Sequence, residues 1–165
     1  MKNLVILGAG TAGTMMANHL VKKLNKKEWQ ITLVDQFKSH YYQPGFLFIP
    51  FGTYQPEDVK RTIDEFLPKG IQLIREKIDR IDKDTDTVIL ENGRNVKYDI
   101  LIIASGSKSN KFGWPGQDLK GVQGLYSYQD LELMEENSRN TKQAVIVGGG
   151  LIGIEMAEML LTRNI

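Results

Sequence analysis

The sequence predicts an α/β fold in which helices flank a parallel sheet and an antiparallel meander is inserted before its last strand. Three observations predict this fold: an apolar strand that leads into a glycine-rich turn and a helix, three further apolar strands along the chain, and three short alternating segments between them. The 165 residues suffice for one ordinary domain, or for one domain and a piece of another.

The first strand and its turn lie within the stretch K-N-L-V-I-L-G-A-G-T-A-G, which runs from Lys2 to Gly13. The apolar run from Asn3 to Leu7 is long enough for a buried strand, and the glycines after it follow the spacing G-x-G-x-x-G. At this spacing Gly8 permits a sharp turn, and Gly10 leaves room for a pyrophosphate beside the backbone. Gly13 lets a helix pack closely on the strand.

The helix and the acid that such a turn requires are both present. Apolar residues recur at helical spacing between Ala12 and Leu24, and a second apolar strand, Gln30 to Val34, follows. Asp35 ends that strand about 20 residues after Gly13, where a Rossmann unit places the acid that binds ribose hydroxyls. The stretch therefore predicts a dinucleotide site, with a purely structural turn as the alternative. FAD and NAD share the adenosine-pyrophosphate half, so the pattern does not distinguish them.

Composition argues against several other kinds of site. The net charge of +1 gives no indication of nucleic-acid binding, and the absence of cysteine excludes disulfides, thiolate metal sites and a cysteine nucleophile. The two histidines, His19 and His40, are too few and too far apart in sequence for a metal cluster. No apolar run approaches the roughly 18 residues that a membrane span needs, and no signal-peptide pattern opens the chain, so a cytoplasmic protein is expected.

An irregular segment from Gln36 to Gln55 follows the acid. Its prolines and glycines disfavour regular structure, yet the run from Phe46 to Phe51 is unusually apolar for a loop. Packing in the core and contact with a cofactor both account for that composition, as does contact with a membrane or a partner.

The middle of the chain predicts the remaining sheet elements. A proline and acids favour a helix from Pro56 to about Leu67, and Ile71 to Ile74 is predicted as a third parallel strand. The three strands of the meander are predicted at Glu76–Asp82, Thr85–Leu90 and Asn95–Tyr98, with an Asn-Gly turn as the hairpin signal. The apolar run D-I-L-I-I-A, residues 99–104, is a fourth buried strand.

The last third of the chain repeats the opening pattern. A glycine-rich connection, residues 108–127, leads to a short acidic helix predicted at residues 128–137. Ala144 to Val147 is then predicted as a strand, followed by a second G-x-G-x-x-G, formed by Gly148, Gly150 and Gly153, and by an apolar helix. Two such units in one chain are stronger evidence for nucleotide binding than one.

Over its whole length the chain resembles the two-dinucleotide-binding flavoproteins of the pyridine nucleotide–disulfide oxidoreductase superfamily. In that superfamily the first glycine pattern holds FAD and the second holds NAD(P)H, and a meander leads to a strand that ends in an A-T-G-like turn, here Ala104-Ser105-Gly106. The stretches Val34–Gly52 and Phe66–Ile74 look most like sulfide:quinone oxidoreductases, with type II NADH dehydrogenases next. The intact second pattern looks like the NADH-dependent branch. The resemblance implies a Rossmann-like three-layer FAD-binding domain.

The resemblance also implies which residues form the site. The aromatic stretch from Tyr41 to Phe51 is expected on the flavin side, and backbone near Lys77-Ile78 is expected at the adenine. Glu155 is expected near the nicotinamide and flavin, with an ordinary glutamate on a helix surface as the alternative. Relatives that reduce disulfides carry a redox cysteine near the position of Gln43, so disulfide reduction is not expected here. The residues expected to contact FAD are Gly8, Gly10, Thr11, Ala12, Gly13, Asp35, Gln36, Tyr42, Pro44, Lys77, Ile78, Ala104, Ser105 and Gly106. Those expected to contact NAD(P)H are Gly148, Gly150, Gly153 and Glu155.

The resulting hypothesis is an FAD-dependent oxidoreductase whose flavin is reduced by NAD(P)H and reoxidised by a quinone or similar acceptor. The alternatives are a sulfide:quinone oxidoreductase whose cysteines lie farther along a longer chain, and a nucleotide-binding fragment without turnover. No metal and no nucleic acid are expected. Membrane contact is expected only through a region beyond this chain.

The expected domains are an FAD-binding domain at residues 1–110, a connection with a short helix at 111–142, and the first strand and helix of an NAD(P)-binding domain at 143–165. The chain thus reads as the N-terminal portion of a longer flavoprotein, without the downstream strand and helix that complete the FAD domain in the family. We expect Ala144–Ile165 to dock onto the FAD-domain sheet and cover its edge, in the same chain or across a homodimer.

Overall fold

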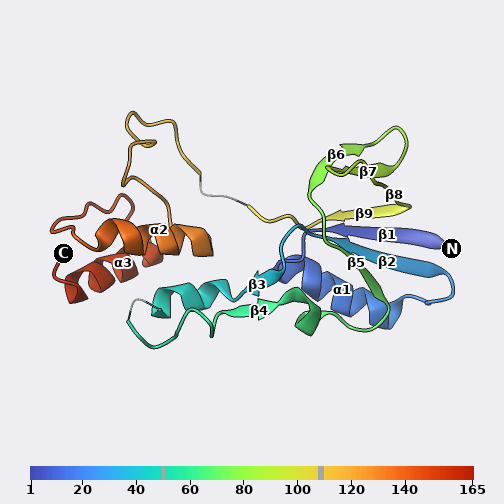
Figure 1. Ribbon diagram of the computed structural model, residues 1–165, viewed down its shortest axis with the longest axis horizontal. Coiled ribbons are helices and arrows are strands. Elements are labelled where there is room, and N and C mark those ends of the chain that lie inside the picture. Colours follow the sequence, from blue (N-terminus) through green and yellow to red (C-terminus); the bar gives the residue numbers. More distant parts are fainter. Residues whose placement is uncertain (50, 108–109) are drawn as a thin grey trace. The chain divides into compact units, whose positions relative to one another are not determined.

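The computed structural model describes residues 1–49, 51–107 and 110–165 (Figure 1). The chain forms two compact units: the first comprises Met1–His40 and Arg61–Ser107, and the second comprises Tyr41–Lys60 and Lys108–Ile165. Each unit has buried hydrophobic clusters of its own. The aromatic loop therefore belongs to the second unit, although it lies in sequence between two parts of the first.

A four-stranded parallel sheet forms the centre of the first unit (Figure 1). Its strands are β1 (Lys2–Leu7), β2 (Trp29–Val34), β5 (Ile71–Ile74) and β9 (Ile100–Ile103), in the order β5-β2-β1-β9. β1 pairs with both β2 and β9, and β2 pairs with β5, always in parallel. The α/β fold class and its four predicted parallel strands are confirmed.

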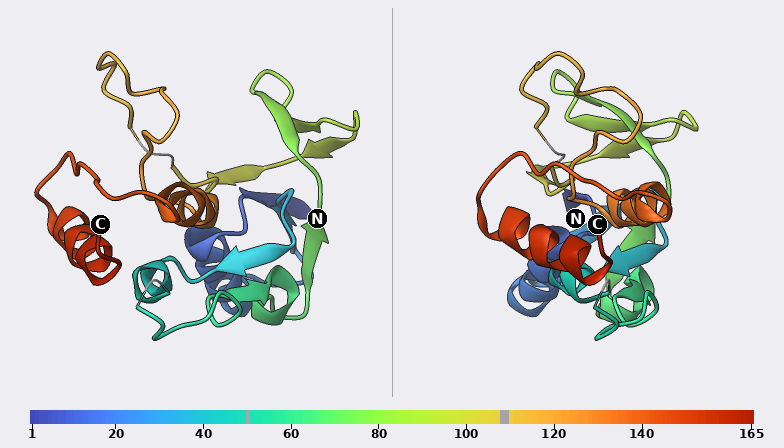
Figure 2. Two further views of the ribbon diagram at one scale, coloured as in Figure 1. Left: turned by 60° about the vertical axis from the view of Figure 1, so that its left-hand side comes forward. Right: turned by 90° about the vertical axis from the view of Figure 1, so that its left-hand side faces the viewer.

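Alternate residues of β1 enter two different hydrophobic clusters. Leu4 and Ile6 pack with helix α1 (Thr11–Lys23), whereas Val5 and Leu7 pack on the opposite face with the meander. Figures 1 and 2 show the helix and the meander on the two sides of the sheet. Burial of each side chain contributes about 1.5–3 kcal/mol. Because both faces are covered, β1 reads as a continuous apolar run.

The meander is confirmed as three antiparallel strands in the order β6-β7-β8. These strands are β6 (Ile78–Asp82), β7 (Thr87–Leu90) and β8 (Asn95–Lys97). Gly93 has a φ of +82° in the turn between β7 and β8, a conformation that favours glycine over residues with a side chain. The Asn-Gly hairpin signal therefore identified this turn correctly.

The helix predicted from Pro56 to Leu67 is wrong. The segment instead contains strand β4 (Lys60–Thr62), which pairs with β3 (Ser39–Tyr41), and the 3₁₀ helix η2 (Ile63–Phe66). The N–H of Thr62 donates to the Glu65 carboxylate at 3.0 Å and so caps the start of this short 3₁₀ helix. Hydrogen bonds from Thr62 also hold the pKa of the Glu65 carboxyl below its usual range.

The second unit packs a short 3₁₀ helix and two α-helices. These are η1 (Gln43–Phe48), α2 (Tyr128–Ser138) and α3 (Leu151–Thr162). Phe46 and Leu131 are buried together, and the rings of Tyr41 and Tyr128 stack with centroids 4.9 Å apart. Burial, with the Glu132 carboxylate nearby, raises the pKa of the Tyr128 phenol. The acidic helix predicted at residues 128–137 is confirmed as α2.

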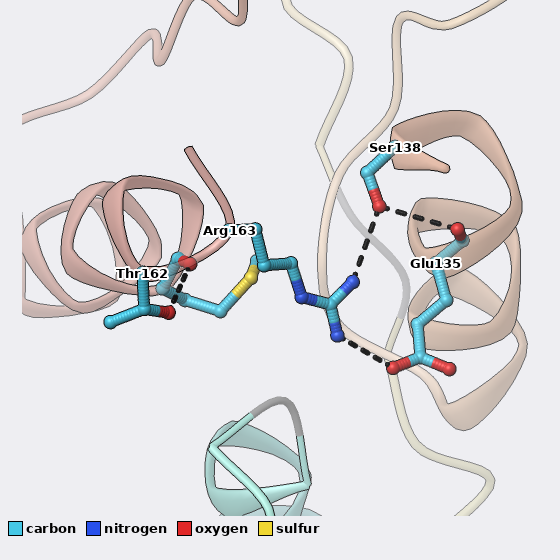
Figure 3. A network of polar contacts seen from close by, with 5 residues as sticks. Glu135, Ser138, Thr162 and Arg163 are labelled. Atoms are coloured by element: carbon cyan, nitrogen blue, oxygen red, sulfur yellow. Dashed lines mark hydrogen bonds and ion pairs between the residues drawn. The ribbon is translucent and has the colours of Figure 1, made fainter. Parts of the chain in front are cut away.

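Arg163, just beyond α3, joins this helix to α2 (Figure 3). Its Nη2 lies 3.0 Å from Oε1 of Glu135, and its Nη1 donates to Oγ of Ser138 at 3.3 Å. A guanidinium that contacts two groups on one helix holds its own helix in a fixed register against it.

Replacing Arg163 with alanine is expected to lower the free energy of unfolding of the second unit by about 1 kcal/mol. The two side chains of the ion pair are 30% and 40% exposed, so solvent screening limits the effect. Urea unfolding of Arg163→Ala, Glu135→Gln and the double variant measures the coupling. A coupling indistinguishable from zero would show that the contact does not stabilise the protein.

The strand predicted at Ala144–Val147 is absent, so this segment adds no strand to the sheet of its own chain, whereas docking across a homodimer stays a prediction. No helix or strand is assigned to residues 141–149, and the side chains of Val145 and Val147 are 90% and 72% exposed. The four-stranded sheet contains no strand from this segment. A strand needs a partner for its backbone N–H and C=O groups, and the described part of the second unit is mainly helical around this segment.

Candidate functional site

The turn between β1 and α1 contains two glycines in tight contact with backbone atoms. Gly8 has a φ of +98°, and a Cβ atom there would lie 2.3 Å from the carbonyl oxygen of Ala104. A Cβ atom at Gly13 would lie 1.8 Å from the carbonyl oxygen of Gly8. Both distances are far below van der Waals contact, so a side chain at either position would displace the backbone.

Gly10, by contrast, faces open space. It precedes α1 with φ −68° and ψ −169°, and no heavy atom lies within 4 Å of a Cβ placed there. No side chain caps this end of α1, and Thr14 N–H donates to the Gly10 carbonyl at 3.0 Å. The N–H groups of Thr11, Ala12 and Gly13 therefore have no acceptor within the helix. Open backbone beside these donors, at the positive end of a helix dipole, fits a pyrophosphate.

Asp35 follows β2 and reaches the glycine turn. Its Oδ2 accepts a hydrogen bond from the N–H of Ala9 at 2.6 Å, and its Oδ1 accepts one from the N–H of Phe37 at 2.7 Å. The backbone N–H of Asp35 donates to the carbonyl oxygen of Ile74 at 3.0 Å, and this hydrogen bond fixes the end of β2 against β5. These contacts place Asp35 against the glycine turn, and the bond to a ribose that the sequence predicts for this acid stays a prediction.

Replacing Asp35 with alanine is expected to lower the free energy of unfolding by about 2 kcal/mol, because the N–H of the buried Ala9 loses a charged acceptor. The same change removes the proposed ribose acceptor, so FAD affinity is expected to fall about tenfold as well. Urea unfolding and FAD titration of Asp35→Ala measure the two effects. Retention of both values would show that the carboxylate neither holds the turn nor binds the cofactor.

The end of β9 lies against the same turn. Ala104 N–H donates to the Leu7 carbonyl at 2.7 Å, and the Cα of Ser105 lies 2.7 Å from the position of a Gly8 Cβ. Gly106 then turns the chain with a φ of +84°. The structure therefore brings Ala104, Ser105 and Gly106 to the carboxyl ends of β1 and β9, where ligands of open α/β sheets bind.

Three further candidates follow the carboxyl ends of β2 and β5. Gln36 is exposed next to Asp35, and Ile78 begins β6 and packs on the meander side of the sheet. Lys77 forms an ion pair with Glu91, and this carboxylate raises the pKa of the lysine. These residues lie at the expected edge of the sheet, and their contact with a cofactor stays a prediction.

The aromatic candidates belong to the second unit. Tyr42 and Pro44 are exposed at the start of η1. Phe46 is only 5% exposed and packs in the core, whereas Phe48 and Phe51 are 48% and 43% exposed. Core packing therefore accounts for one ring of the apolar loop, and the position of the others relative to a flavin stays a prediction.

The second glycine turn repeats the geometry of the first. Gly148 has a φ of +122°, Gly150 precedes α3 with φ −76° and ψ 176°, and a Cβ atom at Gly153 would lie 2.1 Å from the Gly148 carbonyl oxygen. Ile154 N–H donates to the Gly150 carbonyl at 3.1 Å, as Thr14 does to Gly10. The surroundings differ, because nothing lies within 4 Å of a Cβ at Gly148. The turn therefore forms locally, without a paired strand before it.

Glu155 lies on α3 and is half-buried, with an inaccessible Oε2 atom that has no hydrogen-bond partner among the described residues. The Glu155 side chain is therefore less exposed than that of an ordinary glutamate on a helix surface. Its contact with a nicotinamide stays a prediction.

Sequence reasoning did not identify one neighbour of the first turn. Nδ1 of His40 lies 3.3 Å from the carbonyl oxygen of Ala9, and its ring packs against Phe66 with centroids 4.8 Å apart. A single histidine in an irregular segment carries no spacing signal, so only the fold shows that it lies beside the glycines.

The described residues show neither a metal-binding cluster nor a membrane-spanning helix. In residues 1–49, 51–107 and 110–165, no group of three or more histidine, cysteine, aspartate or glutamate side chains could hold a metal ion. Within the same ranges, none of the helices combines the length and the apolar character that crossing a bilayer requires.

Residues 2–164 match the family described as Pyridine nucleotide-disulphide oxidoreductase. The chain is 33% identical over 161 residues to NADH-rubredoxin oxidoreductase of Clostridium acetobutylicum, covering 96% of this chain and 41% of that protein. The crystal structure of that relative superposes with a TM-score of 0.70 over 97% of this chain and 42% of its own. The chain thus spans about two fifths of the length of this relative.

Two other likenesses differ in extent. Sulfide-quinone reductase of Aquifex aeolicus is also 33% identical, but over 118 residues that cover 71% of this chain and 27% of that protein. A ferredoxin reductase structure from Rhodopseudomonas palustris is 24% identical with a TM-score of 0.84, covering 100% of this chain and 41% of that one. This last likeness supports the fold alone.

Proposed function

The chain belongs to the pyridine nucleotide–disulphide oxidoreductase family, and on that premise we propose that it supplies the FAD-binding part of a flavoprotein oxidoreductase. The first glycine turn and Asp35 would hold the adenosine-diphosphate half of FAD. The observation that carries this proposal is the contrast between Gly10, which faces open space, and Gly8 and Gly13, which are closed against backbone. A turn that served packing alone would have no reason to leave its middle glycine open.

Different residues of the chain would bind different parts of FAD. The free N–H groups at the start of α1 would donate to the pyrophosphate, and the Asp35 carboxylate would accept from ribose hydroxyls while still holding the turn. Gln36, Lys77, Ile78 and Ala104–Gly106 would line the rest of the site. When bound, FAD supplies the redox chemistry, which none of the polar side chains at this turn can perform.

We propose NAD(P)H as the electron donor, because the second glycine turn repeats the geometry that suits a pyrophosphate. Gly148, Gly150, Gly153 and Glu155 would contact it. Sulfide is the second candidate, supported by the likeness to a sulfide-quinone reductase over 71% of the chain. A quinone or a small redox protein such as rubredoxin would be the acceptor, by analogy with the NADH-rubredoxin oxidoreductase and the sulfide-quinone reductase that the chain resembles.

The donor proposal predicts that NADH or NADPH bleaches the flavin absorbance of the FAD-loaded protein under anaerobic conditions, whereas sulfide does not. A Gly150→Val variant is expected to lose the bleaching by NADH or NADPH while it retains FAD. Gly150 lies in the second glycine turn, whereas FAD is assigned to the first. Fast bleaching by sulfide alone would reverse the order of the two donors. Binding of FAD with no bleaching by any donor would favour a nucleotide-binding module without turnover.

We also propose that the protein forms a homodimer. Light scattering of the purified protein measures its mass directly. The mass of a single chain at micromolar concentration would exclude the dimer.

A further inference from the structure

Six lysines belong to the segments at the edge of the sheet that lies opposite the first glycine turn. This group, called the lysine patch below, consists of Lys2, Lys22, Lys23, Lys26, Lys27 and Lys69. All six side chains are exposed, and in the described part of the chain none of them forms an ion pair with an acid. The amino ends of β1, β2 and β5 and the carboxyl end of α1 meet there (Figure 1).

Contacts join the segments that carry these lysines. Lys2 N–H donates to the Glu28 carbonyl at 2.7 Å, and its Nζ lies 5.4 Å from the centre of the Trp29 ring. The Nζ of Lys26 lies 3.8 Å from the position of a Cβ at Gly70, the residue after Lys69. The loop between α1 and β2 thus joins the start of β1 to the start of β5.

Few acids offset this charge. Glu28 has an Oε1 that accepts from the Asn25 side chain at 2.8 Å, and Asp99 accepts from the Asn3 N–H at 2.6 Å. The chain as a whole has a net charge of +1, so the six lysines are balanced by acids elsewhere. The dipole of α1 favours lysines at its last turn, which accounts for Lys22 and Lys23 but not for the other four.

One lysine of the patch, Lys26, lines an open pocket of about 220 Å³. Its walls include Val21, Leu24, Ile31 and the half-buried ring of Trp29, and Lys26 lies at its rim. A tryptophan with one apolar side and a neighbouring cation is typical of a surface at a membrane–water boundary.

The choice of cation indicates the kind of partner. Protein interfaces are enriched in arginine and depleted in lysine, and nucleic-acid sites also favour the planar arginine guanidinium. All six cations of the patch are lysines, whose compact and mobile charges suit the diffuse negative potential of an anionic bilayer.

We propose that the lysine patch binds the surface of an anionic lipid bilayer, with Trp29 at the level of the headgroups. Each lysine near such a surface strengthens binding about fivefold. This attraction falls as salt shortens the screening length from about 10 Å at 0.1 M to about 3 Å at 1 M. The patch lies at the opposite end of the strands from the first glycine turn, so binding leaves the proposed FAD site open.

The test is co-sedimentation of the protein with vesicles of phosphatidylcholine alone, or with about one third phosphatidylglycerol. Binding is expected only to the anionic vesicles, and it is expected to disappear at 1 M salt. The triple variant Lys22→Gln/Lys26→Gln/Lys69→Gln is expected to bind about 100-fold more weakly. The matched control Lys83→Gln/Lys120→Gln/Lys142→Gln removes the same charge from exposed lysines outside the patch, and it is expected to lose far less.

Tryptophan fluorescence adds a measurement of position. The chain has two tryptophans, so in Trp114→Phe the emission comes from Trp29 alone and is expected to shift to the blue on anionic vesicles. Equal losses in both triple variants, no binding to anionic vesicles, or no spectral shift would overturn the proposal. Patch-dependent binding to polyglutamate without binding to vesicles would instead indicate an acidic protein partner.

Discussion

Gly13→Val is expected to lower the free energy of unfolding of the first unit by more than about 3 kcal/mol, enough to unfold much of the population. A Cβ atom at this position would lie 1.8 Å from the carbonyl oxygen of Gly8, and backbone cannot move aside as a flexible side chain can. The added side chain would force α1 away from β1 and open the cluster that contains Leu4 and Ile6.

Urea unfolding followed by circular dichroism measures this loss. The matched control is Gly52→Ala, at a glycine that faces open space in the second unit and has a φ of +71°. The control bears only the conformational cost of an alanine at positive φ, about 1–2 kcal/mol. A Gly13→Val protein as stable as the unmodified chain would show that the helix is not closed against the turn.

Gly10→Val is expected to lower the free energy of unfolding by no more than about 1 kcal/mol, the cost of valine at a helix N-cap, and to weaken FAD binding about 100-fold. No heavy atom lies within 4 Å of a Cβ at Gly10, and its φ of −68° is accessible to valine. The branched side chain would occupy the space above the first turn of α1, so the pyrophosphate would lose hydrogen bonds to the free N–H groups of that turn.

The two variants together separate packing from ligand binding. Calorimetric titration with FAD measures the affinity of Gly10→Val, and its urea midpoint measures stability. An unchanged affinity for FAD would show that the pyrophosphate does not bind beside Gly10. An unfolded Gly10→Val protein would instead assign the glycine to packing, which contradicts the open space around it.

Much of the first unit could be predicted from the sequence, because local signals there agree with the tertiary structure. The apolar run of β1 is buried on both faces, the helical spacing of α1 places Ala17 and Val21 on the sheet, and the Asn92-Gly93 turn connects β7 and β8. The spacing between the glycines and Asp35 predicted a ribose-binding acid, but it did not predict that the Asp35 carboxylate accepts a hydrogen bond from Ala9 N–H at 2.6 Å.

The failures share a physical cause, which is dependence on partners that are distant in sequence. Lys60–Thr62 carries helix-like signals but pairs with β3. Ala144–Val147 has the pattern of a strand but pairs with no strand among the described residues. Backbone pairing is decided by what lies beside a segment, which a local pattern does not contain. The contact of His40 with Ala9 was missed for the same reason.

Titration of the purified, flavin-free protein with FAD tests the central claim most directly. We predict saturable binding of one FAD per chain, weakened about tenfold in Asp35→Ala and about 100-fold in Gly10→Val, whereas Gly150→Val binds normally. No binding by the folded protein, or equal affinity in all four proteins, would contradict the assignment of the first glycine turn to FAD.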